Sequence, residues 1–242
     1  GLAGIVARTL LWRRIGCMLA VVGFACQTFM LVMGFHKALP GGLSAGAYFQ
    51  LMAWFVVLCG IAAWAKLRQE IPLVFATPLG LMLFAMSAPY LASVVQVPPS
   101  LNTSFYALHI GALFLSLALL ALAFAAGALS LFMEGRIKSK LTMKGFWLDM
   151  PALSMLDKIN AITTMVGFPL YTLGIVSGLI WAKPVFGGTV TGDPKEVISI
   201  VIWLFYSVLF HNRITKGWKG RKPAQLAVFV FILCLFSIIV VN

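Results

Sequence analysis

The sequence predicts an all-α bundle of transmembrane helices. Of its 242 residues, 62% are hydrophobic and only 10% are charged, and the mean hydropathy is +1.02. A soluble globular protein carries a far larger share of charged residues on its surface. Apolar stretches long enough to cross a bilayer lie at about residues 14–35, 48–67, 72–95, 105–133, 159–181, 194–214 and 225–241. We therefore expect about seven spans in a single transmembrane domain over residues 1–242, and about eight in a longer chain.

The basic residues gather at every second connection between these spans, and the formal net charge is +12. They are Arg8, Arg13 and Arg14, then Lys66 and Arg68, then Arg136, Lys138, Lys140 and Lys144, then Arg213, Lys216, Lys219, Arg221 and Lys222. The positive-inside rule assigns these connections to the cytoplasm and residues 183–196 to an external loop. We expect a multi-pass protein of a bacterial inner membrane. Cytoplasmic connections explain its positive net charge, so we expect no nucleic-acid partner.

The first three predicted spans are interpreted mainly as scaffold. The second and third have no ionisable residue in their interiors, and Pro78 and Pro89 are expected to kink the third. The first span ends at His36, at the predicted outer face. Two interpretations of His36 stay open: an interfacial histidine bonded to water or lipid headgroups, and an axial ligand.

The fourth predicted span carries small and polar residues at helical spacing. They are His109, Ser116, Ala123, Gly127 and Ser130. Small residues let transmembrane helices approach closely, so this face is expected to be buried in the bundle. His109 would then point inward near the outer boundary. An ionisable residue in a span is a candidate functional group, and we favour a ligand role over a structural one.

The connections next to the later spans have distinct predicted roles. Residues 134–158 mix basic and apolar side chains, as expected of a cytoplasmic interfacial segment attracted to anionic lipid. Asp193, Pro194 and Glu196 form a capping box that starts the sixth helix. His211 follows Pro194 by a distance of roughly 26 Å at about 1.5 Å per residue, which places it near the opposite membrane face.

The runs GFPLYTLGIVSGLIWAK (167–183) and GDPKEVISIVIWLFYSVLFHNR (192–213) resemble the cytochrome c assembly family of haem-handling membrane proteins. That family includes CcsA-type and HemX-type proteins. The likeness extends back to YALHIG (106–111) and forward to WKGRKPAQLAVF (218–229), so it covers most of the chain from about Gly46 onward. The resemblance implies that haem binds at the outer face, against a tryptophan-rich loop of pattern W-G-x-x-W-x-W-D, with flanking histidines as iron ligands.

The loop of this chain departs from that pattern at its tryptophans. Phe186, Val190 and Gly192 stand at the three tryptophan positions. Gly187, Asp193, Pro194, Lys195 and Glu196 are retained. This departure favours a HemX-like relative over a protein that presents haem to an apocytochrome.

The resemblance implies that His109 is the external haem ligand, and that His211 is the histidine which family members place within the membrane after the loop. The residues themselves add that His36 and His109, both at the predicted outer face, would suit a bis-imidazole site. Lys183 and Lys195 are candidates for the haem propionates. The expected cofactor-binding set is completed by Trp181, Phe186 and Asp193. His211 would serve a second, inner site or none.

We expect non-covalent haem binding and haem transfer, linked to cytochrome c maturation or haem biosynthesis. Cys17, Cys26, Cys59 and Cys234 show neither CxxC nor CxxCH spacing, which excludes a covalent c-type haem motif. No catalytic set is visible, so we do not expect an enzyme. Expected partners are membrane lipid and a cytochrome c maturation or haem-synthesis protein. Two alternatives remain: a structural or regulatory subunit that docks a soluble enzyme through residues 134–158 or 213–222, and a small-solute transporter.

Overall fold

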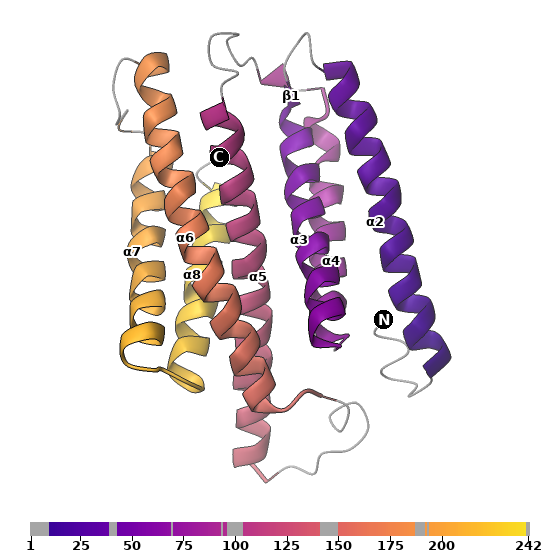
Figure 1. Cartoon of the computed structure of the whole chain (residues 1–242), viewed down its shortest axis with the longest axis vertical. Coiled ribbons are helices and arrows are strands. Elements are labelled where there is room, and N and C mark those ends of the chain that lie inside the picture. Colours follow the sequence, from indigo (N-terminus) through magenta and orange to yellow (C-terminus); the bar gives the residue numbers. More distant parts are fainter. Residues whose placement is uncertain are drawn as a thin grey trace. The chain divides into compact units, whose positions relative to one another are not determined.

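A computed structural model describes residues 10–38, 43–68, 70–92, 94–95, 104–140, 150–186, 192 and 194–240. Within these ranges the regular secondary structure is helical, apart from one two-residue bridge between strands β1 and β2, and this confirms the all-α class. The chain divides into two compact units, residues 1–97 with 138–152 and residues 98–137 with 153–242. Figure 1 labels the long helices of both units and strand β1, and the units are described in turn.

The first unit is built around an antiparallel helical hairpin. Its elements are α2 (Leu10–Ala38), β1 (Leu43–Ser44), α3 (Ala45–Leu67), α4 (Ile71–Met86), a short 3-10 helix η1 (Ala88–Tyr90) and β2 (Val94–Val95). The Ser44 side chain accepts a hydrogen bond from the Ala47 amide and caps the start of α3. Strand β1 pairs antiparallel with β2, Leu43 opposite Val95. These contacts tie the start of α3 to the segment that follows α4.

Glycines bring α3 and α4 into close contact. A Cβ atom at Gly80 would lie 2.6 Å from Cγ2 of Val57, and a Cβ atom at Gly60 would overlap the side chain of Ala76. Because glycine has no side chain, the two backbones approach more closely than larger residues would permit. Helix α2 joins this pair through the indole of Trp54, which stacks on Phe24 and donates a hydrogen bond to Thr28 Oγ1 at 2.8 Å.

The third helix is shorter than the sequence predicts. Helix α4 ends at Met86, whereas the predicted span continues to residue 95. Pro78 lies inside α4, but Pro89 lies in η1, so the expectation that Pro89 kinks this helix was wrong. The Ser87 hydroxyl donates to the carbonyl of Phe84, and its side chain also accepts from Gln50. Pro89 has no backbone N–H, so the α-helical hydrogen bond to the Ala85 carbonyl cannot form and the α-helix ends before it. Hydropathy alone does not detect this stop, because the residues after it are equally apolar.

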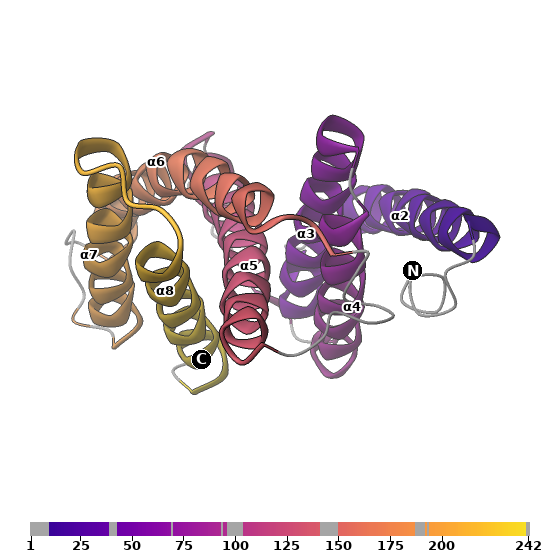
Figure 2. The ribbon, with the colours of Figure 1, turned by 90° about the horizontal axis from the view of Figure 1, so that it is seen from below.

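The described residues of the second unit form four long helices. They are α5 (Ser104–Lys138), α6 (Leu153–Phe186), α7 (Pro194–Thr215) and α8 (Arg221–Val240). Figure 2 shows α8 between α7 and α5. The aromatic pairs agree with this arrangement, since Phe231 of α8 stacks on Phe124 of α5 and Phe229 of α8 meets Phe205 of α7 edge to face. Helix α8 occupies the position of the seventh predicted span.

Helices α5 and α6 extend beyond their predicted spans. Helix α6 has 34 residues, about 51 Å at about 1.5 Å per residue, against a hydrocarbon core of about 30 Å. It begins six residues before the predicted span and continues through Phe186, so the first residues of the predicted 183–196 loop are helical. The start of the predicted interfacial segment, 134–138, is helical in α5, and residues 141–149 of it lie outside the described residues.

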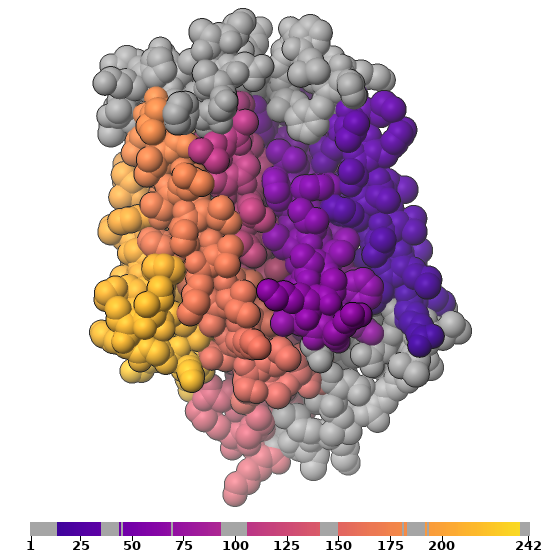
Figure 3. Space-filling view, viewed as in Figure 1, coloured from indigo at the N-terminus to yellow at the C-terminus, as the bar shows by residue number. Residues whose placement is uncertain are grey.

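Six helices are long and apolar enough to cross a membrane among the residues that the structure describes. They are Arg14–Gly34, Gly46–Leu67, Ile71–Tyr90, Tyr106–Lys138, Leu153–Ile180 and Pro194–Thr215. Large apolar side chains remain exposed along them, including Val176 and Ile180 on α6 and Val197 and Leu204 on α7. In Figure 3 the side chains of α6 run along most of one face of their unit. Apolar ridges of this extent suit contact with lipid, and the protein is a polytopic membrane protein.

Candidate functional site

Three polar contacts join α5 to α6 along one antiparallel seam. His109 Nδ1 lies 2.7 Å from the carbonyl oxygen of Gly174, the Ser116 hydroxyl donates to the carbonyl of Gly167 at 2.7 Å, and the Asn160 amide donates to the carbonyl of Ala123 at 2.8 Å. Positions 109, 116 and 123 on α5 and positions 174, 167 and 160 on α6 are each seven residues apart. A seven-residue repeat keeps one contact line between two helices when they coil gently around each other.

The buried face that the sequence predicts on α5 is confirmed by this seam. Ser116 and Ala123 are fully buried, and Ser130 is nearly so. Gly127 lies against the backbone of Ala224 on α8 and beside the Asn160 side chain. Small residues on α5 therefore admit both α6 and α8, as close packing between membrane helices requires.

His109 is half-buried and rests on α6 at two glycines, Gly174 and Gly178. A Cβ atom at Gly178 would lie 2.5 Å from Nδ1 and 2.6 Å from Cε1 of the His109 ring. The carbonyl of Gly174 only accepts hydrogen bonds, so the 2.7 Å contact requires the proton on Nδ1. The lone pair of the neutral ring is then on Nε2, the nitrogen that remains for a ligand.

His211 lies in a different place from His109. It is on the exposed side of α7, whereas the next two residues, Asn212 and Arg213, are buried. Arg213 bonds to Asn160, and Asn160 bonds to Ala123 of α5. Ala123 is fourteen residues from His109, which is about 21 Å along the helix at about 1.5 Å per residue. The structure therefore does not bring His109 and His211 together.

The other predicted site residues lie partly outside the described residues. The backbone of His36 is in the last turn of α2, in the first unit, and its side chain is outside the described part. The side chains of Trp181, Lys183 and Phe186 at the end of α6 are outside it too, as is Asp193. Lys195 is exposed in the first turn of α7, where Glu196 accepts a hydrogen bond from the Gly192 amide at 3.2 Å.

Lys195 lies toward the same end of the second unit as His109. Across α6 and α7, Trp203 faces Thr172, and Ile200 faces Ile175 and Val176. Because the two helices run in opposite directions, the first turn of α7 lies beyond Ile200 toward the end of α6, about one helical turn past the His109 contact at Gly174.

A buried ion pair that the sequence analysis missed joins the opposite ends of these helices. The Arg213 guanidinium donates to Asp157 Oδ1 at 2.9 Å, to the carbonyl of Trp218 at 2.8 Å and to Asn160 Oδ1. Asp157 Oδ1 also accepts from the Gly220 amide at 3.0 Å. The sequence groups Arg213 with the basic residues that follow the sixth span, whereas the structure has it in the last turn of α7 with its side chain only 3% exposed.

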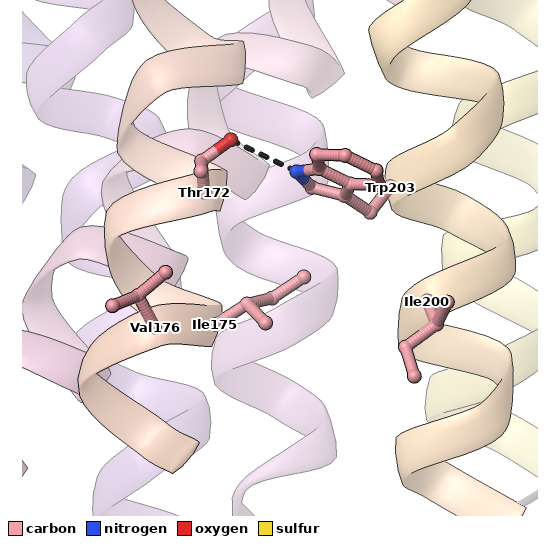
Figure 4. Close-up of a pocket in the computed structure, with 5 residues that line it drawn as sticks. All are labelled: Thr172, Ile175, Val176, Ile200 and Trp203. Atoms are coloured by element: carbon pink, nitrogen blue, oxygen red, sulfur yellow. Dashed lines mark hydrogen bonds between the residues drawn. The ribbon is translucent and has the colours of Figure 1, made fainter. Parts of the chain in front are cut away.

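A small apolar pocket opens between α6 and α7 on the outside of the unit. Its volume is about 220 Å³, and it is lined by Thr172, Ile175 and Val176 of α6 and by Ile200 and Trp203 of α7. Figure 4 shows the Trp203 indole donating to Thr172 Oγ1, a hydrogen bond of 2.9 Å. The pocket is smaller than the roughly 300–1,000 Å³ of typical ligand sites, and its lining does not include His109. We assign no cofactor to it.

The fold and these contacts define a polytopic helical membrane protein with one histidine held at a helix seam. Among the described residues, no three His, Cys, Asp or Glu side chains group as a metal-binding cluster. The sequence family described as "Cytochrome C assembly protein" matches residues 43–242. The chain belongs to this cytochrome c assembly family, as its motifs predict.

Individual relatives are cytochrome c biogenesis proteins named CcsA. The chain is 28% identical to that of Synechococcus sp. (strain CC9902) over 215 residues, which are 79% of this chain and 71% of the relative. It is 30% identical to that of Prochlorococcus marinus (strain MIT 9301) over 213 residues, 79% of this chain and 69% of the relative. The protein of Mesostigma viride is 39% identical over 88 residues, 36% of this chain and 29% of the relative. Each alignment thus covers only part of the relative.

Proposed function

We propose that this membrane protein binds haem non-covalently through His109 and transfers it during cytochrome c maturation or haem biosynthesis. One observation carries the proposal: His109 Nδ1 is engaged by the Gly174 carbonyl at 2.7 Å, which leaves Nε2 with its lone pair. Metal-bound histidines in proteins usually have this arrangement, with the second nitrogen donating to a carbonyl or carboxylate. The relatives are cytochrome c biogenesis proteins, which supports a role in cytochrome c maturation.

Further residues of this chain are proposed around the cofactor. His36 is the second axial ligand in this proposal, and Lys183 and Lys195 pair with the propionates. Lys195 lies toward the same end of the unit as the His109 contact, which supports its assignment. Trp181, Phe186 and Asp193 complete the contact set at the end of α6 and the start of α7. His211 is outside this site, because the end of α7 that carries it is linked through Arg213 and Asn160 to Ala123, about 21 Å along α5 from His109.

The proposed orientation follows from the charges of the connections. We place the His109 end of the unit at the external face of a bacterial inner membrane, and the α7–α8 turn in the cytoplasm. Lys216, Lys219, Arg221 and Lys222 are all exposed at that turn, as the positive-inside rule expects of a cytoplasmic connection. The proposed partner is a cytochrome c maturation or haem-synthesis protein, and haem is the cargo that this membrane protein transfers.

Absorbance spectra of the purified protein test this function. We expect oxidised and reduced haem spectra from the wild type and from His211→Ala, loss of the Soret band or a change of ligation in His109→Ala, and a change of ligation in His36→Ala. Wild-type protein that neither contains haem nor takes up added haem would refute the proposal and favour a structural or regulatory subunit. Solute flux through haem-free protein in liposomes would favour a transporter instead.

A further inference from the structure

Two glycines of α6 face two side chains of α5 one helical turn apart. Gly178 lies under the His109 ring, and Gly174 lies under Leu113. A Cβ atom at Gly174 would be 2.6 Å from Cδ2 and 2.7 Å from Cγ of Leu113. The sequence indicates only that the glycine pair permits close helix packing. The structure shows that one of the two glycines accommodates an imidazole and the other an aliphatic side chain.

The contact at Gly178 excludes any larger residue while the ring stays in place. A Cβ atom there would lie 2.5 Å from Nδ1 and 2.6 Å from Cε1 of His109, and 3.5 Å from Cγ. Optimal contacts between carbon atoms lie at about 3.5–4.0 Å, so the ring would have to move by roughly 1 Å. Such a movement would lengthen the 2.7 Å contact between Nδ1 and the Gly174 carbonyl beyond hydrogen-bond distance.

We propose that Gly178 is a positioning residue for His109: it lets the Nδ1–Cε1 edge of the ring lie against α6, where the Gly174 carbonyl holds the proton on Nδ1 and Nε2 remains as the ligand. A role of Gly178 in haem binding rests on the proposed function. The position of the His109 ring does not depend on that function, because the ring has this position in the protein without haem.

Ser177 shares the carbonyl that holds the ring. Its hydroxyl donates to the carbonyl of Leu173 at 2.7 Å and lies 3.0 Å from the carbonyl oxygen of Gly174. Ser177 is buried, so its hydroxyl depends on these intrahelical acceptors. Ser177→Ala leaves the Gly174 carbonyl to His109, and this variant should keep the Nδ1–H tautomer that Gly178→Ala loses.

Nuclear magnetic resonance of haem-free protein tests the inference directly. The chain has three histidines, so ¹⁵N-labelled histidine gives three pairs of ring signals, and His109→Ala identifies one pair. We expect the Nδ1–H tautomer for His109 in the wild type and in Ser177→Ala. We expect its loss in Gly178→Ala, as a mixture of tautomers or the Nε2–H form. Gly111→Ala is the matched control, because a Cβ atom at Gly111 meets nothing within 4 Å.

Haem titration of the same variants separates this inference from the proposed function. Loss of a group that orients a metal ligand typically lowers affinity about 10- to 100-fold, so we expect at least a tenfold loss in Gly178→Ala and little change in Gly111→Ala. A wild type that binds no haem but shows the expected tautomers would refute the proposed function and support the role of Gly178. If Gly178→Ala showed the same His109 ring signals as the wild type, that role would be overturned, whether or not the protein binds haem.

A stability cycle covers the case in which Gly178→Ala folds poorly. If the overlap with the imidazole is what destabilises that variant, His109→Ala must relieve it. We therefore expect Gly178→Ala to lower the apparent melting temperature in the wild-type background and to leave it nearly unchanged in the His109→Ala background. An equal loss in both backgrounds would overturn the inference, because some contact other than the ring would then be responsible.

Discussion

Removing the Asp157 carboxylate should destabilise the second unit more than any single exposed substitution. Asp157 Oδ1 accepts from the Arg213 guanidinium at 2.9 Å and from the Gly220 amide at 3.0 Å. The side chains of Arg213 and Asp157 are 3% and 18% exposed. In Asp157→Ala a buried guanidinium keeps its contacts to Trp218 and Asn160 but loses its counterion.

The magnitude follows from the number and kind of bonds lost. Breaking a buried ion pair by removing one partner typically costs about 3–5 kcal/mol, and a hydrogen bond to a charged group contributes about 1.5–3 kcal/mol. Since Arg213 keeps two acceptors and Asp157 is partly exposed, we expect about 3 kcal/mol for Asp157→Ala. Asp157→Asn keeps an acceptor oxygen but loses the charge, so about half that loss is expected.

Equilibrium unfolding in detergent micelles, followed by tryptophan fluorescence, measures these differences in the free energy of unfolding. Lys219→Ala is the matched control on the same turn, since exposed substitutions usually stay within about 0.5 kcal/mol. A double variant of Asp157→Leu with Arg213→Met should lose less than the sum of its single variants, because no unpaired charge remains. A loss in Asp157→Ala as small as that in Lys219→Ala would show that our reasoning is wrong.

Two further predictions concern contacts between α6 and α7. Gly167→Ala should destabilise the protein by about 1–3 kcal/mol, because its Cβ atom would overlap the buried Tyr206 hydroxyl. Adding Tyr206→Phe to this variant removes the hydroxyl and should partly restore the melting temperature; no recovery would contradict the prediction. Trp203→Phe removes the 2.9 Å hydrogen bond to Thr172 Oγ1, and such bonds between membrane helices average about 0.6 kcal/mol. A double-mutant cycle with Thr172→Val measures that coupling, and a value near zero would refute it.

Local patterns predict the helices of this chain because each one is a long apolar run with recognisable ends. Pro194 begins α7 as the capping pattern requires, and the small-residue stripe on α5 is buried. The end of α4 escapes a prediction made from hydropathy, since Pro89 stops the α-helix within an apolar segment. Such a stop leaves no trace in hydropathy, although the proline itself is visible in the sequence.

The candidate site is harder to predict because its contacts join residues far apart in the chain. His109 stands out as an ionisable residue in a span, but its partner Gly174 is 65 positions away. Arg213 resembles a loop charge until Asp157, 56 positions away, is placed beside it. One signal was available: acidic residues number only six against eighteen basic ones, so an aspartate beside a span was a candidate for a buried pair.

The seven-residue spacing of the α5–α6 seam limits how the lengths of these two helices can change. One residue inserted between His109 and Ser116 would rotate the rest of α5 by about 100°, so the Ser116 and Asn160 contacts would be lost together while the His109 contact remained. Seven residues turn a helix by nearly two full turns, with a remainder of only about 20°. Among natural relatives, insertions and deletions between the seam contacts are therefore expected to be seven residues long. Outside the seam, the two helices can change in length by any number of residues.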